Sequence, residues 1–412
     1  MKIALHTYGC KVNSYETEII RQQIKSVSLC GEDADIHIIN TCTVTEKIDK
    51  EILRKIKQLK KNGKKVILTG CLVERKDEDA RNILSFADGI ITNKEKFELG
   101  KFFNQKNYDD NQLLYDFTGR DRAFIKIEDG CNNYCSYCEV PYVRGDKIKS
   151  KKIEDIKKEF TILSETGFNE IVLTGVNLGL FGRDKNKNNA LYELLLELIK
   201  IKNNTRIRLS SIGPKELSDE VISLIADSYG KICPHVHLSL QSGDDKILKL
   251  MNRNYTLNEY IEKMEKLILK IPYCAITTDV IAGFPGEGEK EFQNTYDFIK
   301  KMNFSRLHVF SFSKRPDTKA SKMPEQVKEE IKKLRVKKLI NLGKIKEKEF
   351  AYKNLGLVRK VLVESEEKDG YKVGYTDNYI RVRFKVHVNL TGQLVDVRLQ
   401  EYKDGFVYGE MV

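Results

Sequence analysis

Three cysteines lie within eight positions of the stretch DGCNNYCSYCEVPYVRG, residues 129–145. They are Cys131, Cys135 and Cys138, in a C-x3-C-x2-C spacing. A loop of this length can fold back and bring three thiolates to one face of an iron–sulfur cluster, since such clusters are held by cysteine thiolates. A cubane held in this way keeps one iron without a protein ligand. An open metal position of that kind can bind and activate a small molecule.

A structural zinc site is the alternative for this loop, and it needs a fourth ligand from elsewhere in the chain. The candidates are Cys233, Cys274 and His235. These residues lie on or beside apolar stretches with strand character, where a buried cysteine usually serves as a small hydrophobic residue. The sequence therefore favours the iron–sulfur cluster and leaves zinc open.

Three further cysteines each follow a predicted parallel strand, in the contexts TYGC, NTC and TGC. They are Cys10, Cys42 and Cys71, separated by 32 and 29 residues, intervals that match no spacing rule for zinc. Because the carboxyl ends of parallel strands meet at one edge of an open sheet, we expect the three thiols to converge there. Cys30 belongs to neither group and is read as incidental.

Alternating strand and helix patterns must position both cysteine groups. In the first part of the chain, residues 2–8, 35–40 and 65–70 are predicted strands, and 16–29 and 44–61 are predicted helices. The polar stretch 104–112 is typical of a linker. From residue 123 the alternation restarts with six strands and five helices, which predicts a partial TIM-like barrel with reactive groups at the carboxyl ends of its strands. The strands are 123–129, 170–176, 206–212, 235–241, 275–284 and 306–312, and the helices lie near 153–166, 190–201, 218–228, 256–270 and 288–302.

The last part of the chain has a different pattern of apolar and charged residues. Residues 322–349 form one charged helical run, and five short alternating strands follow residue 356, which is typical of a small β-barrel. The predicted fold is α/β throughout: an open parallel sheet, a partial (β/α)6 barrel and a small antiparallel β-barrel. We place the domains at 1–115, 117–347 and 350–412.

Composition limits the classes of protein that remain. With 41% apolar residues in 412, the chain can bury several cores, and it has no apolar run long enough to span a membrane. Nine cysteines without an export signal favour metal or redox chemistry in the cytoplasm over a disulfide framework. The net charge of +12 is compatible with a polyanionic partner, although a lysine-rich surface gives the same value.

The cysteine loop that follows the first strand of a six-fold barrel resembles the radical S-adenosylmethionine (SAM) superfamily, and its extended form GCNNYCSYCEVPYVRG resembles the methylthiotransferases. TYGCKVNSYETE, NTCTVTEK, LTGC, LSLQSGDDKILKLMNRNYT, TTDVIAGFPGE and FSFSKRPDT match this family too, so the resemblance covers almost the whole chain. It implies a 4Fe-4S cluster on Cys131, Cys135 and Cys138 that cleaves SAM to a radical. It also implies a second 4Fe-4S cluster, on Cys10, Cys42 and Cys71, that carries the sulfur to be transferred.

Residues at the predicted strand ends and beside the cysteine loop are candidates for binding SAM. In the family, Arg253 meets the carboxylate of the methionine moiety and Tyr137 lies beside the adenine. Two positions depart from the family pattern, because Glu139 replaces an apolar residue and Asp317 replaces a glycine. The full set of candidates is Tyr137, Gly175, Asn177, Ser211, Gln241, Arg253, Asp279 and Phe310.

The terminal barrel resembles the TRAM domain, a small RNA-binding module. Aromatic and basic side chains of such barrels bind unpaired bases and phosphates, and the candidates here are Tyr375, Tyr379, Arg381 and Arg383, with Phe384 beside them. The resemblance implies a tRNA methylthiotransferase that acts on the anticodon stem-loop, with a flavodoxin or ferredoxin as electron donor and a separate sulfur source. The form GCKVN followed by YET is nearest to the branch acting on N6-threonylcarbamoyladenosine.

Three other functions remain open. The substrate could be N6-isopentenyladenosine in tRNA or a residue of a ribosomal protein, and the basic terminal barrel weighs against the latter. A non-catalytic RNA-binding protein with two zinc sites is the alternative from another class.

Overall fold

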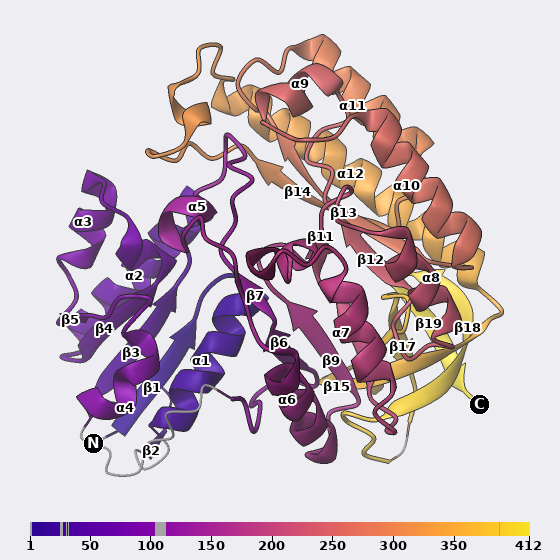
Figure 1. Cartoon of the computed structure of the whole chain (residues 1–412), viewed down its shortest axis with the longest axis horizontal. Coiled ribbons are helices and arrows are strands. Elements are labelled where there is room, and N and C mark those ends of the chain that lie inside the picture. The colour runs from indigo at the N-terminus through magenta and orange to yellow at the C-terminus, as the bar shows by residue number, and fades with distance from the viewer. Residues whose placement is uncertain (1, 25–27, 30, 32, 104–112, 387) are drawn as a thin grey trace.

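The structure is a computed structural model of the 412-residue chain, and it describes residues 2–24, 28, 29, 31, 33–103, 113–386 and 388–412. Cys30 and the predicted linker at 104–112 lie outside the described residues. The indigo and purple sheet at the left of Figure 1 is the amino-terminal part, the magenta to orange elements form the centre, and the yellow barrel lies at the right. None of the described helices combines the length and apolar composition that a membrane span needs.

The amino-terminal sheet is parallel, with strand order β2-β1-β3-β4-β5. Its central strands are strongly apolar because both faces are covered: Ile38 packs in one hydrophobic cluster and Ile39 in another on the opposite face. The predicted strands are confirmed as β1, β3 and β4. The elements are β1 (Lys2–Thr7), α1 (Lys11–Gln23), β2 (Ser28–Leu29), β3 (Ile36–Thr41), α2 (Glu46–Lys61), β4 (Lys65–Gly70), η1 (Cys71–Glu74), α3 (Glu78–Leu84), β5 (Gly89–Ile90), η2 (Lys96–Glu98) and α4 (Leu99–Phe102).

The prediction of the first helix at 16–29 was wrong in its bounds. Helix α1 begins five residues earlier, directly after its N-cap residue Cys10, and ends at Gln23. Its first turns bury the polar residues Asn13, Glu16 and Thr17 as well as the apolar Val12 and Tyr15. The buried polar residues weaken the apolar periodicity that marks a helix where α1 starts.

All six predicted strands of the central partial barrel are present, one of them divided in two. They form two parallel sheets, β10-β9-β6 and β11-β12-β13-β14, because the predicted strand 206–212 is interrupted at Ser210 and divides into β10 and β11. All five predicted helices are present. The elements are β6 (Ala123–Lys126), α6 (Ile153–Glu165), β9 (Glu170–Thr174), α7 (Ala190–Ile199), β10 (Arg206–Leu209), β11 (Ser211–Ile212), α8 (Asp219–Asp227), β12 (His235–Leu238), α10 (Leu257–Lys270), β13 (Ala275–Ala282), α11 (Glu289–Lys301) and β14 (Arg306–Ser311).

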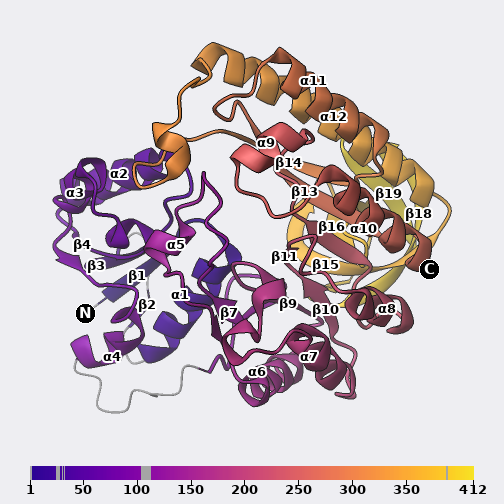
Figure 2. The same cartoon turned by 45° about the horizontal axis from the view of Figure 1, so that its top comes forward.

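Short elements decorate the barrel, and one long helix closes its side. Helix α12 (Glu329–Asn354) packs against β14, where a Cβ at Gly343 would come within 3.3 Å of Leu307 Cβ. It lies beside α11 in both views (Figures 1 and 2). The short elements are β7 (Glu128–Asp129), α5 (Val140–Val143), β8 (Lys149–Ser150), η3 (Leu178–Leu180), η4 (Arg183–Lys185), α9 (Asp245–Leu250) and η5 (Lys319–Lys322).

The carboxyl-terminal strands close into a barrel of order β15-β16-β17-β19-β18. Its pairings are antiparallel except for β17 with β19, which is parallel. Closure leaves no exposed sheet edge, so this small barrel needs no further strand to complete it. The strands are β15 (Val358–Lys368), β16 (Tyr371–Thr376), β17 (Arg381–Phe384), β18 (Leu394–Lys403) and β19 (Phe406–Met411).

A buried ion cluster joins this barrel to the central one. The fully buried Glu170 carboxylate contacts Arg122, Arg206 and Arg208 at 3.4, 2.7 and 2.8 Å. Burial opposes its charge, yet the three guanidinium groups hold the pKa of Glu170 well below its usual range. Arg206 and Arg208 also donate to four backbone carbonyls of residues 360 and 375–377, so one carboxylate orients the arginines that hold the terminal barrel.

We predict that Glu170→Gln destabilises the protein by about 3–5 kcal/mol, because it leaves buried guanidinium groups without a carboxylate. The measurement is the unfolding midpoint together with proteolysis of residues 358–411, which are expected to become accessible first. Glu193→Gln is the control, since its pair with Lys187 is about half exposed and its loss is expected to change stability by less than about 1 kcal/mol. Equal effects of the two variants would contradict the prediction.

Candidate functional site

Cys10, Cys42 and Cys71 follow β1, β3 and β4, which are neighbours in the sheet. Their thiols lie close enough to interact electrostatically, as the carboxyl ends of parallel strands would bring them. Gly9 has a φ of +95°, and a Cβ there would lie 2.5 Å from Cys42 Sγ. Glycine at this position therefore permits the close approach of the first cysteine loop to the second.

Burial controls the protonation of this triad. It raises the pKa of Cys42 to about 12, with the Cys71 thiol adding to the effect, and it also raises the pKa of Cys71. Cys10 differs in being exposed, as the N-cap residue of α1. A bound cationic centre would be needed to hold the two buried sulfurs as thiolates.

The second triad, Cys131, Cys135 and Cys138, occupies the loop between β7 and α5. This loop is fixed by backbone hydrogen bonds, from the Cys131 N–H to the Gly145 carbonyl at 3.1 Å and from the Ser136 N–H to the Met251 carbonyl at 3.0 Å. Burial raises the pKa of Cys131 to about 11 and of Cys138 to about 12. As in the first triad, these thiols ionise only with a strong electrostatic partner.

The spacing of the sulfurs bears on the choice of metal. Among the described residues, the ligand atoms of His237, Asp279 and His308 all lie within 4.8 Å of one another, whereas neither cysteine triad forms such a group. Tetrahedral zinc, with Zn–S bonds of about 2.3 Å, would place its sulfurs about 3.8 Å apart. The sulfurs of neither triad are therefore as close together as one zinc ion requires.

The fourth ligands proposed for a zinc site lie at the wrong end of the barrel. Cys233 and Cys274 precede β12 and β13, and His235 is the first residue of β12. The cysteine loop follows β6 and β7, at the carboxyl ends of the parallel strands. Because Cys233 and Cys274 are also buried among apolar residues, they serve as core side chains.

Arg144 connects the two triads. It belongs to the second cysteine loop, and its charge interacts with the Cys71 and Cys10 thiols of the first. It contacts Asn13 and lies 3.1 Å from both Glu16 Oε1 and Asp129 Oδ2. The second cysteine loop therefore lies against the part of the amino-terminal sheet that carries the first triad.

The predicted SAM residues fall into three groups. Arg253 and Tyr137 lie beside the second triad: Arg253 Nη1 is 3.1 Å from Cys135 Sγ, and the charges of Tyr137 and Arg253 interact. Gly175 and Asn177 shape the loop after β9, where Asn177 Oδ1 accepts the Gly213 N–H at 3.2 Å. The third group consists of the remaining candidates. Gln241 is hydrogen-bonded through its backbone to β13, and Phe310 is exposed on β14. Ser211 and Asp279 line a pocket that is described below.

Glu128 was missed by the sequence reasoning, although it explains Gly175. Its carboxylate accepts the Asn177 N–H at 2.6 Å, and a Cβ at Gly175 would lie 2.7 Å from its Cδ. Burial raises the pKa of Glu128 to about 8. The only signal in the sequence was the position of Glu128, an acidic residue inside a predicted strand, three residues before Cys131.

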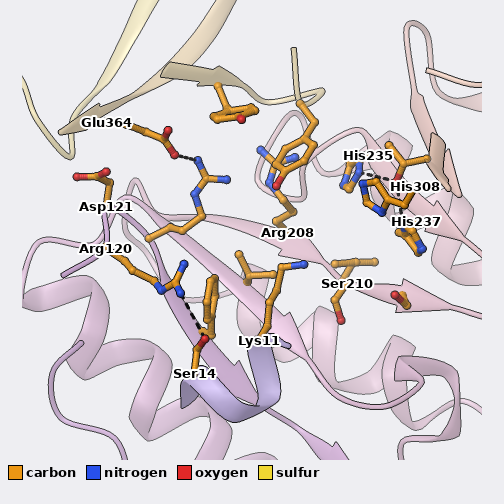
Figure 3. A pocket seen from close by; sticks show the side chains of 18 of the residues that line it. Lys11, Ser14, Arg120, Asp121, Arg208, Ser210, His235, His237, His308 and Glu364 are labelled. Atoms are coloured by element: carbon orange, nitrogen blue, oxygen red, sulfur yellow. Dashed lines mark hydrogen bonds and ion pairs between the residues drawn. The ribbon is translucent and has the colours of Figure 1, made fainter. Parts of the chain in front are cut away.

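A pocket of about 660 Å³ opens between all three parts of the chain (Figure 3). Gly9, Lys11 and Ser14 enter from the amino-terminal part, and Tyr375 and Tyr379 from the terminal barrel. The barrel strands supply its floor, including Arg208, Ser210, Ser211, His235, His237, Asp279 and His308. Asp279 lies between His237 and His308, at 3.2 and 3.3 Å, and these two contacts keep its pKa below the usual range despite burial.

The predicted RNA-binding residues separate into two pairs. Tyr375 and Tyr379 line the pocket, with Tyr379 stacked on His235 at 4.7 Å between ring centroids and Arg208 4.6 Å from the same ring. Arg381 and Arg383 instead lie over Phe406, and Arg383 is buried. Arg381 is nevertheless the cross-strand partner of Tyr375 and lines a narrow cavity with Tyr379, so the two pairs are neighbours.

The two departures from the family pattern have structural accounts. Glu139 is buried 3.8 Å from Arg75, beside Asp49 and Arg315, in an ion cluster between the amino-terminal part and the barrel; burial raises its pKa to about 7. Asp317 is exposed, and it is absent from the described residues with a positive φ. The turn that contains Asp317 therefore does not require glycine.

Comparison with known proteins agrees with this geometry. The profile of the radical SAM superfamily matches residues 125–299, and that of the uncharacterized protein family UPF0004 matches residues 2–92. A solved structure of the radical S-adenosylmethionine methyltransferase TsrM from Kitasatospora setae superposes with a TM-score of 0.58 at 13% identity, covering 78% of this chain and 77% of that one. At this identity the likeness shows a shared fold.

Relatives of known name match over nearly the full length. The threonylcarbamoyladenosine tRNA methylthiotransferases MtaB of Thermotoga maritima and Bacillus subtilis are 36% and 38% identical, over 98% and 99% of this chain and 95% of each relative. The tRNA-2-methylthio-N(6)-dimethylallyladenosine synthase of Acetivibrio thermocellus is 34% identical over 99% of this chain and 90% of its own. Because these relatives are 34% to 38% identical over nearly the whole chain, the chain belongs to the radical SAM methylthiotransferase family.

Proposed function

We propose that this protein converts N6-threonylcarbamoyladenosine at position 37 of tRNA to its 2-methylthio derivative. The observation that carries the proposal is that Arg144, from the second cysteine loop, acts on the Cys10 and Cys71 thiols of the first triad, beside a pocket that all three parts of the chain line. The printed names of the relatives in Thermotoga maritima and Bacillus subtilis support the threonylcarbamoyl substrate. The dimethylallyl substrate of the relative in Acetivibrio thermocellus is the second candidate.

S-adenosylmethionine and 4Fe-4S clusters are the cofactors of this family, and the donor sets fit them. We assign one cluster to Cys131, Cys135 and Cys138 and the other to Cys10, Cys42 and Cys71. When bound, the clusters and SAM supply radical chemistry at an unactivated aromatic C–H, which has no acidic proton for a base to remove. Three thiolates per cluster leave each with one position for a ligand that is not protein.

The residues around the second triad would orient SAM. Arg253 carries a fixed charge next to Cys135 and suits a carboxylate, and its stacking on the Tyr255 ring at 4.9 Å holds the guanidinium plane in place. Tyr137 packs in an apolar cluster beside the loop, where an adenine could stack. The proposed set also keeps Gly175, Asn177, Ser211, Gln241, Asp279 and Phe310.

The anticodon stem-loop would approach the pocket from the side of the terminal barrel. Tyr375 and Tyr379 have ring centroids 5.0 Å apart and offer stacking faces to an unpaired base. Arg381 and Arg383 would act on the phosphates from the neighbouring surface, although both already contact Phe406. The flavodoxin or ferredoxin electron donor, the sulfur source, the cytoplasmic location and the domain division at 1–115, 117–347 and 350–412 stay predictions.

Mass spectrometry of tRNA nucleosides from cells with and without the gene tests the function. We expect 2-methylthio-N6-threonylcarbamoyladenosine alone to disappear, while its precursor without sulfur accumulates. Loss of the dimethylallyl product would instead select the second candidate. An unchanged tRNA profile would remove the proposal, and a changed ribosomal protein mass would point to the other methylthiotransferase class.

Iron and sulfide analysis of anaerobically purified protein tests the clusters. We expect about eight iron atoms per chain, and about four in both Cys42→Ala and Cys135→Ala, because each triad holds one 4Fe-4S cluster. Cys274→Ala is the matched control, since this buried cysteine lies at the opposite end of the barrel and its loss should leave the iron count unchanged. Zinc without iron would support the non-catalytic RNA-binding protein.

A further inference from the structure

The pocket between the three parts of the chain carries an uneven distribution of charge. Every acidic side chain that lines it already has a hydrogen-bond or ion-pair partner. Glu364 pairs with Arg122, Glu366 with Arg381 at 2.6 Å, Asp279 with His237 and His308, and Asp121 accepts both the N–H and the hydroxyl of Ser365 at 3.0 and 3.2 Å.

Two cations in the same wall are not neutralised. Within the part of the chain that the structure describes, Lys11 and Arg306 have no hydrogen-bond or ion-pair partner, although both line the pocket. Arg120 meets only the Ser14 hydroxyl at 3.5 Å and the Phe124 ring. Lys11 and Arg306 therefore offer positive charge that no carboxylate of the pocket takes up, which favours an anionic ligand.

Buried polar atoms without partners mark where that ligand sits. Ser210 is 8% exposed and its hydroxyl has no partner, and His235 is 5% exposed with an unpartnered Nδ1. Both residues line the pocket. In Figure 3, the side chain of Lys11 rises from the start of α1 toward Arg208 and Ser210. Leaving buried donors unsatisfied is costly, so a polar ligand group is expected at this point.

Lys11 also has a fixed relation to the chemistry, because it directly follows Cys10 at the start of α1. A group held by Lys11 is therefore held next to the first triad. Arg306, in contrast, opens β14 and also lines a narrow cavity with Tyr379 and Arg381, on the side of the terminal barrel. The two free cations serve different parts of the ligand.

The substrates named for the relatives differ in the charge of their N6 group. A threonine joined through its amine to a carbamoyl group keeps a free carboxylate and a hydroxyl, whereas a dimethylallyl group is a neutral hydrocarbon. A carboxylate takes charge-assisted hydrogen bonds from an ammonium and a hydroxyl. A hydrocarbon would leave Lys11 and Ser210 unsatisfied.

We propose that Lys11, with the Ser210 hydroxyl, binds the carboxylate of the threonylcarbamoyl group and so makes this enzyme selective for an anionic N6 substituent. The inference rests on the proposed function for the identity of its ligand. Removing the Lys11 ammonium group is therefore expected to weaken recognition of the threonylcarbamoyl carboxylate, while the general electrostatic attraction to RNA remains. Arg306 contributes that general attraction through the phosphates.

The test measures binding of anticodon stem-loop RNAs to the full-length holoenzyme by fluorescence anisotropy at one fixed salt concentration. Three RNAs differ only at N6 of the target adenosine, which carries threonylcarbamoyl as the free acid, its methyl ester, or dimethylallyl. Wild type is expected to bind the acid about tenfold or more tighter than the ester, since a hydrogen bond to a charged group is lost in the ester. Lys11→Gln is expected to bind acid and ester equally, and Lys11→Arg to restore most of the preference.

Two controls separate this effect from loss of charge or of folding. Arg306→Gln removes an equally unpaired cation from the same pocket and is expected to weaken all three RNAs by the same factor. Ser210→Ala is a milder change and is expected to reduce the acid preference about threefold without affecting the ester. The ratio of acid to ester affinity is taken on one protein at a time, so a partly folded variant does not change it.

An acid preference that survives in both Lys11→Gln and Ser210→Ala would overturn the proposal, as would equal weakening of acid and ester in Lys11→Gln. The nucleoside analysis is independent of this result. If 2-methylthio-N6-threonylcarbamoyladenosine persists in cells that lack the gene while the acid preference depends on Lys11, the proposed function fails and the anion site stands.

Discussion

The buried carboxylate of Glu16 is the interaction on which the arrangement of the site depends. It is 1% exposed and lies 2.6 Å from Lys96 Nζ, 2.8 Å from Lys126 Nζ and 3.1 Å from Arg144 Nη1. Burial opposes its ionisation, but these three cations keep the pKa of Glu16 well below its ordinary value. They come from the amino-terminal part, the first barrel strand and the second cysteine loop, so one charge fixes the position of three elements.

Two further clusters, each built on one buried carboxylate that contacts several arginines, join other parts of the chain. Asp49 accepts from Arg75 and Arg315 at 2.7 and 2.6 Å, which ties α2 to the loop after β14. Glu170 contacts three arginines of the central barrel, two of which hold the backbone of the terminal barrel. Buried ion pairs contribute little net stability compared with apolar packing, but an unpaired partner is costly. Their effect is therefore on geometry, because only one relative placement of the parts satisfies every charge.

That placement explains why the site is divided among distant segments. Each triad is held by its own sheet or loop, whereas the pocket takes residues from all three parts of the chain. The elements alone would leave the distance between the triads undefined. Arg144, which reaches Glu16 and Asn13 from the second cysteine loop, brings that distance within the range of electrostatic interaction between the loops.

The sequence could predict the local features that follow a short-range rule. Strand alternation, the cysteines at strand ends and the closed terminal barrel all have such a rule, and each is confirmed in β1 to β19. The start of α1 was missed, because the polar residues Asn13, Glu16 and Thr17 are buried by tertiary contacts and weaken the helical period. Arg381 and Arg383 were grouped with Tyr375 and Tyr379 by motif, yet both guanidinium groups lie over Phe406 and neither lines the large pocket.

By itself, then, the sequence determined which side chains are available for metal and radical chemistry and at which strand ends they occur, since strand and helix periods are local properties of the chain. Only the tertiary structure decided which charges are neutralised and which remain free. Arg122, Arg208 and Arg306 look alike in the sequence, but two of them are paired with Glu170 and one is not. The physical reason is that pairing depends on distances between residues far apart in the sequence, here 48 residues for Arg122 and 38 for Arg208, which the completed fold alone sets.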